Sequence, residues 1–139
     1  MISPKNPDNE RLRQRSVEKY QLLDTSEEED YDNITSIAAY IAQTPISLIT
    51  LLDGERNFFK SHLGLEFSES PRKLSFCGHA INSNEDILII EDARKDKRFF
   101  DNPLVTGIKA IFYAGVPLVT PDGAKLGTLC VYDHKPRSL

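Results

Sequence analysis

The sequence predicts an α+β domain in which helices cover one face of an antiparallel sheet and irregular segments cover the other. The first observation is the order of patterns along the chain, which runs helix, helix, two strands, short helix, strand, long connection, two strands. The second is a pair of hairpin signals, Asp53-Gly54 and Pro121-Asp122-Gly123, each placed between β-branched runs. The third is the long connection 92–107, which carries aromatic residues among its charges and should fold over the sheet.

Length and composition limit the classes of protein to which the chain can belong. The chain has 139 residues, of which 40% are hydrophobic and 27% are charged, so one domain with a packed core is expected. A net charge of -4 argues against a nucleic-acid partner, which needs a basic surface. No apolar run is long enough to span a membrane, and the polar start lacks the apolar centre of a signal peptide. We therefore expect a cytoplasmic location, with Cys77 and Cys130 as free thiols.

Two helices are predicted at the start of the chain. The first covers residues 9–23 and has an apolar stripe so narrow that it must pack on another helix or on a second copy of the chain. The second begins at a capping box formed by Thr25 and Glu28, ends before Pro45, and should cover the sheet with one apolar face. The predicted apolar residues are Leu12, Val17, Tyr20 and Leu23 in the first helix and Ile34, Ile37, Ala38 and Ile41 in the second.

The remaining pattern is mostly β. Runs of β-branched and aromatic residues predict five strands, and a short helical segment is expected between the second and the third. The expected strands are 46–52, 56–63, 87–91, 111–119 and 125–132, and the expected short helix is 76–82.

Five strings along the chain carry a family resemblance. They are Tyr20-Gln21-Leu22-Leu23-Asp24-Thr25, Ser75-Phe76-Cys77-Gly78-His79-Ala80-Ile81, Asp96-Lys97-Arg98-Phe99-Phe100-Asp101-Asn102-Pro103-Leu104-Val105, Phe112-Tyr113-Ala114-Gly115-Val116-Pro117-Leu118 and Leu126-Gly127-Thr128-Leu129-Cys130-Val131-Tyr132-Asp133. Together, and in this order from about Arg11 to Leu139, they resemble a bacterial subgroup of the GAF domain family.

The resemblance implies a sheet of five to six strands in the order 2-1-5-4-3, with helices on one face and a ligand pocket under loops on the other. It implies a single domain over residues 1–139, with a flexible segment 1–9 and without the final helix of the family. It also implies a non-catalytic sensor that passes a signal to an attached histidine kinase or to a diguanylate cyclase or phosphodiesterase. Ile111 departs from the family, which commonly has an arginine there, so a basic contact to an anionic ligand is missing.

The candidate ligand pocket lies between the sheet and the segments 75–82 and 92–107. Its ligand is expected to be an unidentified small molecule, and its walls are expected to use aromatic and sulfur-containing side chains. Neighbouring strand residues point to opposite faces, so only one of Phe112 and Tyr113 can line the pocket. The candidate residues are Phe76, Cys77, His79, Phe99, Phe112, Tyr113 and Cys130.

Other chemistries can be constructed from the same residues. Cys77 beside His79 suggests a thiol nucleophile, but positions two apart on a helix face apart. Adding Cys130 and His134 makes a metal set on paper, without the spacing of known zinc sites. Gly78 separates Cys77 from His79, unlike the adjacent pair of bilin-binding relatives, so no cofactor is expected.

Two rival functions stay open. The first is a dimerisation or interaction module with a closed pocket, which uses the first helix for a homodimer. The second is an enzyme resembling the free methionine sulfoxide reductases.

Overall fold

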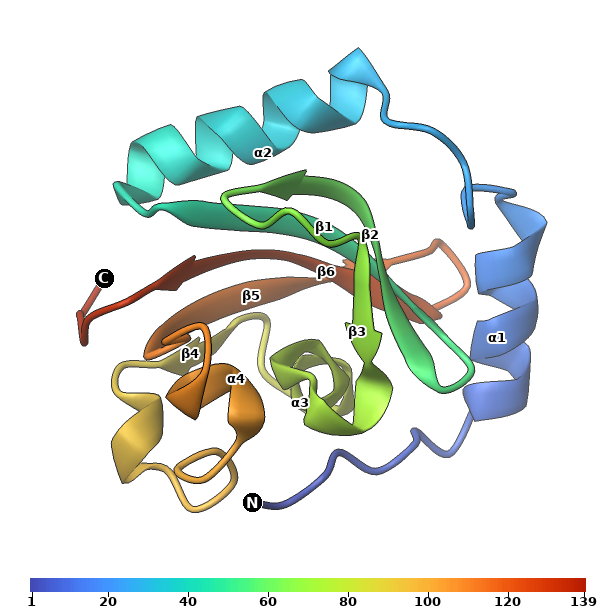
Figure 1. Cartoon of the computed structure of the whole chain (residues 1–139). Helices are drawn as coiled ribbons and strands as arrows, with labels where there is room; N and C mark the ends of the chain where they lie inside the picture. The colour runs from blue at the N-terminus through green and yellow to red at the C-terminus, as the bar shows by residue number, and fades with distance from the viewer.

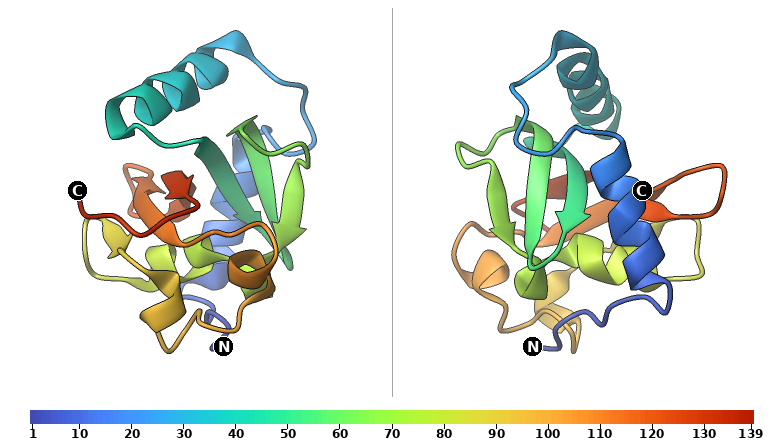
Figure 2. Two further views of the ribbon diagram at one scale, coloured as in Figure 1. Left: turned by 60° about the vertical axis from the view of Figure 1, so that its left-hand side comes forward. Right: turned by 90° about the vertical axis from the view of Figure 1, so that its right-hand side faces the viewer.

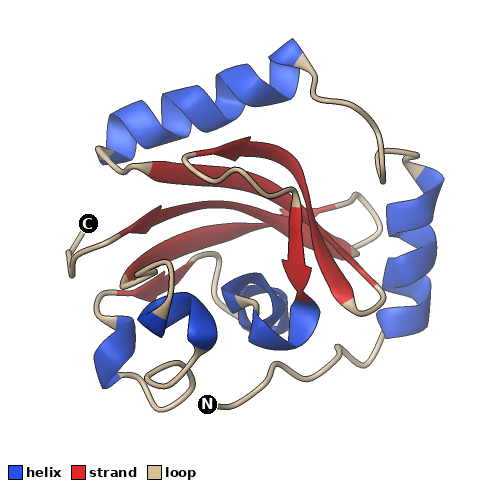
Figure 3. Cartoon of the chain, in the orientation of Figure 1, coloured by secondary structure: helices blue, strands red, loops and turns tan.

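A six-stranded antiparallel sheet forms the centre of the computed structural model, which describes all residues from 1 to 139 (Figures 1 and 3). The spatial order is β3-β2-β1-β6-β5-β4. This confirms the expected order 2-1-5-4-3, because the short β3 only adds an edge strand beside the second strand. The strands are β1 Ile46–Asp53, β2 Arg56–Leu63, β3 Glu69–Pro71, β4 Leu88–Ile90, β5 Phe112–Val119 and β6 Lys125–Asp133.

The two hairpins form where the turn residues predict them. Gly54 joins β1 to β2 with a φ of +56°, and Gly123 lies in the turn between β5 and β6 with a φ of +88°. Glycine adopts these left-handed conformations without a steric cost. The turns fix which residues of the paired strands face each other, and therefore which side chains reach each face of the sheet.

Helices and irregular segments divide between the two faces. The helices α1 (Glu10–Lys19) and α2 (Glu29–Ala42) pack on one face, whereas α3 (Phe76–Asn82) and α4 (Pro103–Thr106) lie on the other (Figures 1 and 2). Two short 3-10 turns, at 72–74 and 93–95, complete this second layer. The main hydrophobic cluster lies between the sheet and α3, so the face expected to hold a pocket is also the face with the larger core.

The predicted apolar face of α2 is wrong for its isoleucines, whereas Ala38 packs on the sheet as predicted. Ile37 and Ile41 are 58% and 75% exposed, and the buried residues of the helix are Thr35 and Ala39. The Thr35 hydroxyl lies 2.9 Å from that of Ser61 on β2. Small and polar residues let this helix approach the sheet closely, and the larger isoleucines are turned outward.

The predicted capping box of α2 is also absent. The helix begins after Glu28, and no side chain caps its first turn. The Thr25 hydroxyl instead lies 2.5 Å from the carbonyl oxygen of Leu22 and 2.6 Å from Nζ of the buried Lys60. Thr25 therefore stabilises the loop between the two helices.

The first helix is shorter than predicted and is fixed by a buried charge. It ends at Lys19, and of its predicted stripe only Val17 is fully buried. Arg13 on the same helix is completely buried, and its guanidinium donates to the carbonyl oxygens of Leu52 at 2.7 Å and Leu126 at 3.2 Å. The carboxylate of Glu10 balances its charge, with Oε1 2.8 Å from Nε of Arg13.

The segment 1–9, for which the resemblance implies flexibility, runs along α3 in this structure (Figure 1). The backbone amide of Ile2 donates to the carbonyl oxygen of Arg98 at 3.0 Å. The side chain of Asn82 donates to the carbonyl oxygen of Lys5. None of the helices has both the length and the apolar composition needed to cross a membrane.

Candidate functional site

The long connection folds back across the sheet, as its aromatic residues predict. We call residues 92–111 the lid. Phe99 in the lid is 1% exposed, and its ring stacks on that of Phe76 with 4.2 Å between centroids and 10° between planes. Asn102 anchors the lid, because its side chain accepts from the amide of Leu104 at 2.8 Å and donates to the carbonyl oxygen of Leu74 at 2.9 Å. Phe99 and Asn102 therefore anchor the middle of the lid to the core.

Aromatic rings fill most of the space beneath the lid. Phe76 from α3 contacts Phe99 from the lid, Tyr113 from β5 and Tyr132 from β6, with centroid distances of 4.2, 5.2 and 5.6 Å. His79 meets the edge of this cluster, with its ring 5.0 Å from that of Phe99. A cluster packed this closely leaves no room for a ligand of four rings or of nucleotide size in this arrangement.

Two thiols meet under the aromatic cluster. Sγ of Cys77, on α3, lies 3.9 Å from Sγ of Cys130, on β6, and both residues are buried. The hydroxyl of Thr128 donates to Sγ of Cys77 at 3.1 Å, and the hydroxyl of Tyr113 does so at 3.6 Å. Thr128 in turn lies 3.0 Å from the hydroxyl of Thr50 on β1. The two thiols therefore share a small polar centre inside an apolar core.

The polar centre affects the two thiols in opposite directions. Burial acts to raise the pKa of Cys77, but hydrogen bonds from Cys130 and the surrounding hydroxyls outweigh it and hold that pKa below its ordinary value. Burial, together with the neighbouring Cys77, raises the pKa of Cys130 well above its ordinary value. Cys77 is therefore the thiol of this pair that more readily loses its proton.

His79 takes no part in this polar centre. Its Nε2 lies 2.8 Å from the carbonyl oxygen of Ile2, which can only accept, so the neutral ring donates there. Burial lowers the pKa of His79, which favours this neutral form. The ring binds the N-terminal segment, and no hydrogen bond joins it to Cys77.

The structure brings six of the seven candidate residues to the face of the sheet beneath the lid. Phe76, Cys77, Phe99, Tyr113 and Cys130 belong to one buried cluster, and His79 touches its edge. Phe112 lies on the opposite face, where it packs with Ala114, Val131 and α2. Of the neighbouring pair on β5, Tyr113 is therefore the residue that faces the lid.

A small hollow remains at the other end of the lid. Its volume is about 10 Å³, which is close to the space that one water molecule needs. Asn57 on β2 lines it, is 2% exposed, and has no hydrogen-bond partner for its Oδ1. The walls are Ile46, Leu48, Phe59, Tyr132, Ser70 and Ser75, and the cover is Leu65, Phe67, Leu104 and Ile108.

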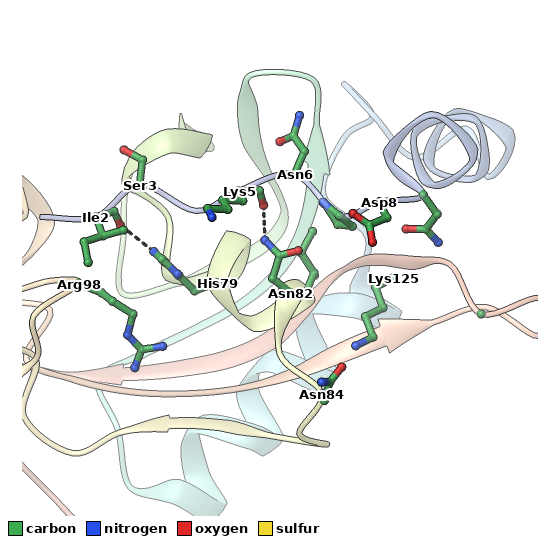
Figure 4. Close-up of a pocket in the computed structure, with 14 residues that line it drawn as sticks. Ile2, Ser3, Lys5, Asn6, Asp8, His79, Asn82, Asn84, Arg98 and Lys125 are labelled. Atoms are coloured by element: carbon green, nitrogen blue, oxygen red, sulfur yellow. Dashed lines mark hydrogen bonds between the residues drawn. The ribbon is translucent and has the colours of Figure 1, made fainter.

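A larger pocket lies elsewhere and is open and polar. It has a volume of about 670 Å³ and lies between the N-terminal segment and α3, where His79 and Asn82 hold the backbone of Ile2 and Lys5 (Figure 4). Arg98 and Lys125 also border it, but Arg98 pairs with Asp96 at 2.8 Å, and Lys125 donates to the carbonyl oxygen of Ser83 at 2.8 Å. Lys5 is a third cation at this pocket, and Asp8 also lines it, so the pocket carries charges of both signs.

No group of three or more histidine, cysteine, aspartate or glutamate side chains is placed to hold a metal ion. Of the set that can be drawn on paper, Cys77 and Cys130 are buried together, whereas His134 is exposed, with its Nδ1 3.2 Å from the carbonyl oxygen of Lys109. The four residues Cys77, His79, Cys130 and His134 therefore do not converge on one position where a metal ion could bind.

Several residues of this site are not among the candidates that the sequence predicts. Thr50, Thr128 and Tyr132 surround the thiols, and Asn57 lines the hollow. The sequence pattern could have indicated Asn57, because residues two apart on a strand point to the same face. Asn57 therefore shares the face of β2 on which Phe59 packs into the core. A lone amide on the inward face of a strand marks a polar point in an apolar wall.

Comparison with known proteins agrees with the geometry. The chain is 42% identical over 138 residues to a cyclic di-GMP phosphodiesterase of Pseudomonas aeruginosa, and the match covers 99% of this chain and 23% of that protein. This chain therefore spans about a quarter of the length of that relative.

Two examples illustrate the solved structures that share the fold. The GAF domain of an Acinetobacter phosphoenolpyruvate-protein phosphotransferase has 20% identity and a TM-score of 0.60, over 95% of this chain and 81% of that one. A free methionine-R-sulfoxide reductase of Neisseria meningitidis, solved with its substrate, has 14% identity and a TM-score of 0.63, over 100% of this chain and 83% of that one. At these identities the likeness concerns the fold alone. The sequence model of the GAF domain covers residues 26–139, so this chain belongs to the GAF domain family.

Proposed function

We propose that this GAF domain is a non-catalytic sensor that binds a small organic molecule beside Asn57, in a hollow that widens as its cover opens. The observation that carries the proposal is the buried Oδ1 of Asn57, which has no partner within the chain. A buried acceptor without a partner costs about 1–3 kcal/mol. A ligand that donates a hydrogen bond to this oxygen would recover that energy.

The construction of the hollow supports this position. Its floor is made by β1, β2 and β6 of the sheet, whereas its cover comes from the loop after β2 and from the lid. Leu65, Leu104 and Ile108 in the cover are only half-buried, so they have room to move outward. A rigid floor under an adjustable cover suits a ligand that enters as the cover opens. The ligand should be mainly apolar and carry one N–H or O–H group.

The arrangement of reactive groups favours binding over catalysis. Cys77, the thiol whose pKa is lowered, is hydrogen-bonded to hydroxyls and to another thiol, and the nearby His79 is engaged with the backbone of Ile2. No base is therefore hydrogen-bonded to the thiol that would act as nucleophile, as an acyl- or sulfur-transfer enzyme needs.

The relatives suggest the context of the signal. The similar Pseudomonas protein is named a cyclic di-GMP phosphodiesterase and is more than four times as long as the matched region. We infer that this domain is an input module of cyclic di-GMP or two-component signalling, and that its effector is an attached kinase, cyclase or phosphodiesterase. Binding would shift the population of lid positions and bias the effector through that shift.

The test of ligand binding uses a matched pair of asparagine variants. The full chain is screened by thermal shift against small, mainly apolar metabolites that carry one N–H or O–H group, and each hit is titrated by calorimetry. Asn57→Leu removes the acceptor and should weaken a true ligand by about ten-fold or more. Asn84→Leu, at an exposed position, is the control and should leave the affinity unchanged. A ligand that binds Asn57→Leu as tightly as the wild type would place the site elsewhere.

A second function, an interaction module with a closed pocket, is favoured by the apolar surface of α2. Ile37, Tyr40 and Ile41 are exposed on this helix, and beside it lies an apolar groove of about 370 Å³ between α2 and the sheet. The first helix offers less apolar surface to a partner, since Val17 faces the sheet. Light scattering of the wild type, Ile41→Glu and Leu12→Glu would test it: a dimer lost only in Ile41→Glu supports the α2 surface, and a monomeric wild type opposes this function.

A further inference from the structure

We propose that Cys77 and Cys130 form a disulfide within the domain when it meets a hydroperoxide such as hydrogen peroxide. The pair is thus a modification site that is separate from the hollow beside Asn57. The proposal does not depend on a ligand in that hollow, because the two thiols make their contact without one.

The geometry of the pair carries the inference. The two Sγ atoms are 3.9 Å apart, and a disulfide bond is about 2.05 Å long, so the sulfurs must approach by roughly 1.9 Å. Cys130 lies on β6, which is hydrogen-bonded to β1 on one side and β5 on the other. Cys77 lies on α3, a helix of seven residues between irregular segments. The approach therefore requires a small shift of α3 toward a fixed strand.

The surroundings assign different roles to the two thiols. Thr128 and Tyr113 donate hydrogen bonds to Cys77 and thereby stabilise its thiolate. The lowered pKa of Cys77 and the raised pKa of Cys130 agree with this assignment. Cys77 is therefore the thiol that attacks the peroxide, and Cys130 is the thiol that resolves the product. The chain has only these two cysteines, so no other internal pairing competes.

The chemistry balances with hydrogen peroxide as the only oxidant. The thiolate of Cys77 attacks one peroxide oxygen, the O–O bond breaks, and the leaving hydroxide takes a proton to become water, which leaves a sulfenic acid on Cys77. The sulfur of Cys130 then attacks Sγ of Cys77, and the S–O bond breaks as the S–S bond forms. The departing hydroxide takes the thiol proton of Cys130 and leaves as a second water. Two thiols lose two electrons in total, and one peroxide gains them.

Burial sets the rate at which the pair reacts. Both thiols lie under Phe76 and the lid, so the peroxide reaches them only when this layer opens. Once formed, the disulfide would join α3 to β6 and hold this helix against the sheet. Oxidation should therefore stiffen the packing of α3 against the sheet.

The first experiment exposes the reduced full chain to hydrogen peroxide and follows it by intact-mass spectrometry. We expect a mass loss of about 2 Da that dithiothreitol reverses, and one peptide pair that joins Cys77 to Cys130. The melting temperature should rise by roughly 5–10 °C in the oxidised protein.

Two variants assign the roles. Cys130→Ser should stop at a sulfenic acid on Cys77, which dimedone captures, whereas Cys77→Ser should oxidise at least about ten-fold more slowly. Thr128→Val keeps the shape of the side chain, removes the donor to Cys77, and should slow oxidation of a chain that retains both thiols. The proposal is overturned if both thiols of the folded wild type stay open to alkylation after peroxide treatment, if the only cross-links join separate chains, or if Cys77→Ser reacts as fast as Cys130→Ser.

Discussion

Phe99→Ala tests the role of the lid most directly. The Phe99 ring is 1% exposed, stacks on Phe76 at 4.2 Å, and is met at its edge by His79 at 5.0 Å. Removing a buried phenylalanine ring costs about 3–5 kcal/mol, because it forfeits the transfer energy and leaves a cavity. We expect a loss in this range, since Phe76 and Tyr113 are held by α3 and β5 and can collapse only partly into the space.

The next residue provides a matched control. Phe100 is 54% exposed, and Phe100→Ala should change the free energy of unfolding by no more than about 0.5 kcal/mol. Urea unfolding followed by circular dichroism measures both variants under one condition. Phe99→Ala should also speed the alkylation of Cys77, because the layer above that thiol is loosened. Equal unfolding free energies for the two variants would show that the lid does not stabilise the domain.

Three further predictions follow from the charged contacts. Burial acts to raise the pKa of Glu10, but hydrogen bonds from Arg72 and Arg13 outweigh it and lower that pKa from 4.5 to about 2. The ionised carboxylate therefore stabilises the fold fully above pH 4.5 and loses this effect as the pH falls toward 2, so Glu10→Gln should flatten the fall of the melting temperature in that range. Arg13→Met leaves the carbonyls of Leu52 and Leu126 without their donor and should cost about 1–3 kcal/mol in urea unfolding, whereas the exposed Arg15→Met should cost almost nothing. Arg137→Ala removes the donor to the carbonyls of Ala42 and Gln43 and should speed hydrogen exchange in the last turn of α2 while leaving β1 unchanged.

The β-hairpins could be predicted closely because their signals are local. The turns at Gly54 and Gly123 need residues that accept a positive φ, and the flanking runs are β-branched, so the turn and the strands point to one structure. The second strand and the short helix were predicted with the bounds that the structure has, Arg56–Leu63 and Phe76–Asn82. Such elements depend little on the rest of the chain.

The orientation of α2 could not be predicted, because it depends on contacts distant in sequence. Hydrophobicity alone favours Ile37 and Ile41 as the inward residues. The structure turns Thr35 inward instead, where its hydroxyl meets Ser61 of β2. The burial of Arg13 was missed for a related reason: its partners are backbone carbonyls of β1 and β6, which leave no trace in the residue types.

The candidate site was predicted in part. Phe76, Cys77, Phe99, Tyr113 and Cys130 were named from the sequence and do meet beneath the lid. The close contact of the two sulfurs was not anticipated, because 53 positions separate them and only the pairing of α3 with the sheet brings them together. The open space was placed among these residues, but their rings fill it, and the remaining hollow lies beside Asn57.

A physical connection between the lid and the helical face follows from two shared residues. The amide of Ile111, at the end of the lid, donates to the carbonyl oxygen of Asp133 at 3.0 Å, and the side chain of Asp133 accepts from Arg137 at 3.1 Å. Arg137 also donates to the carbonyl oxygens of Ala42 and Gln43, where α2 ends. Under the proposed function, a ligand that moved the lid would act on Asp133, whose partner Arg137 holds the end of α2. The isoleucines of α2 face outward. A displacement at the end of this helix would therefore alter the apolar surface that a partner protein would contact.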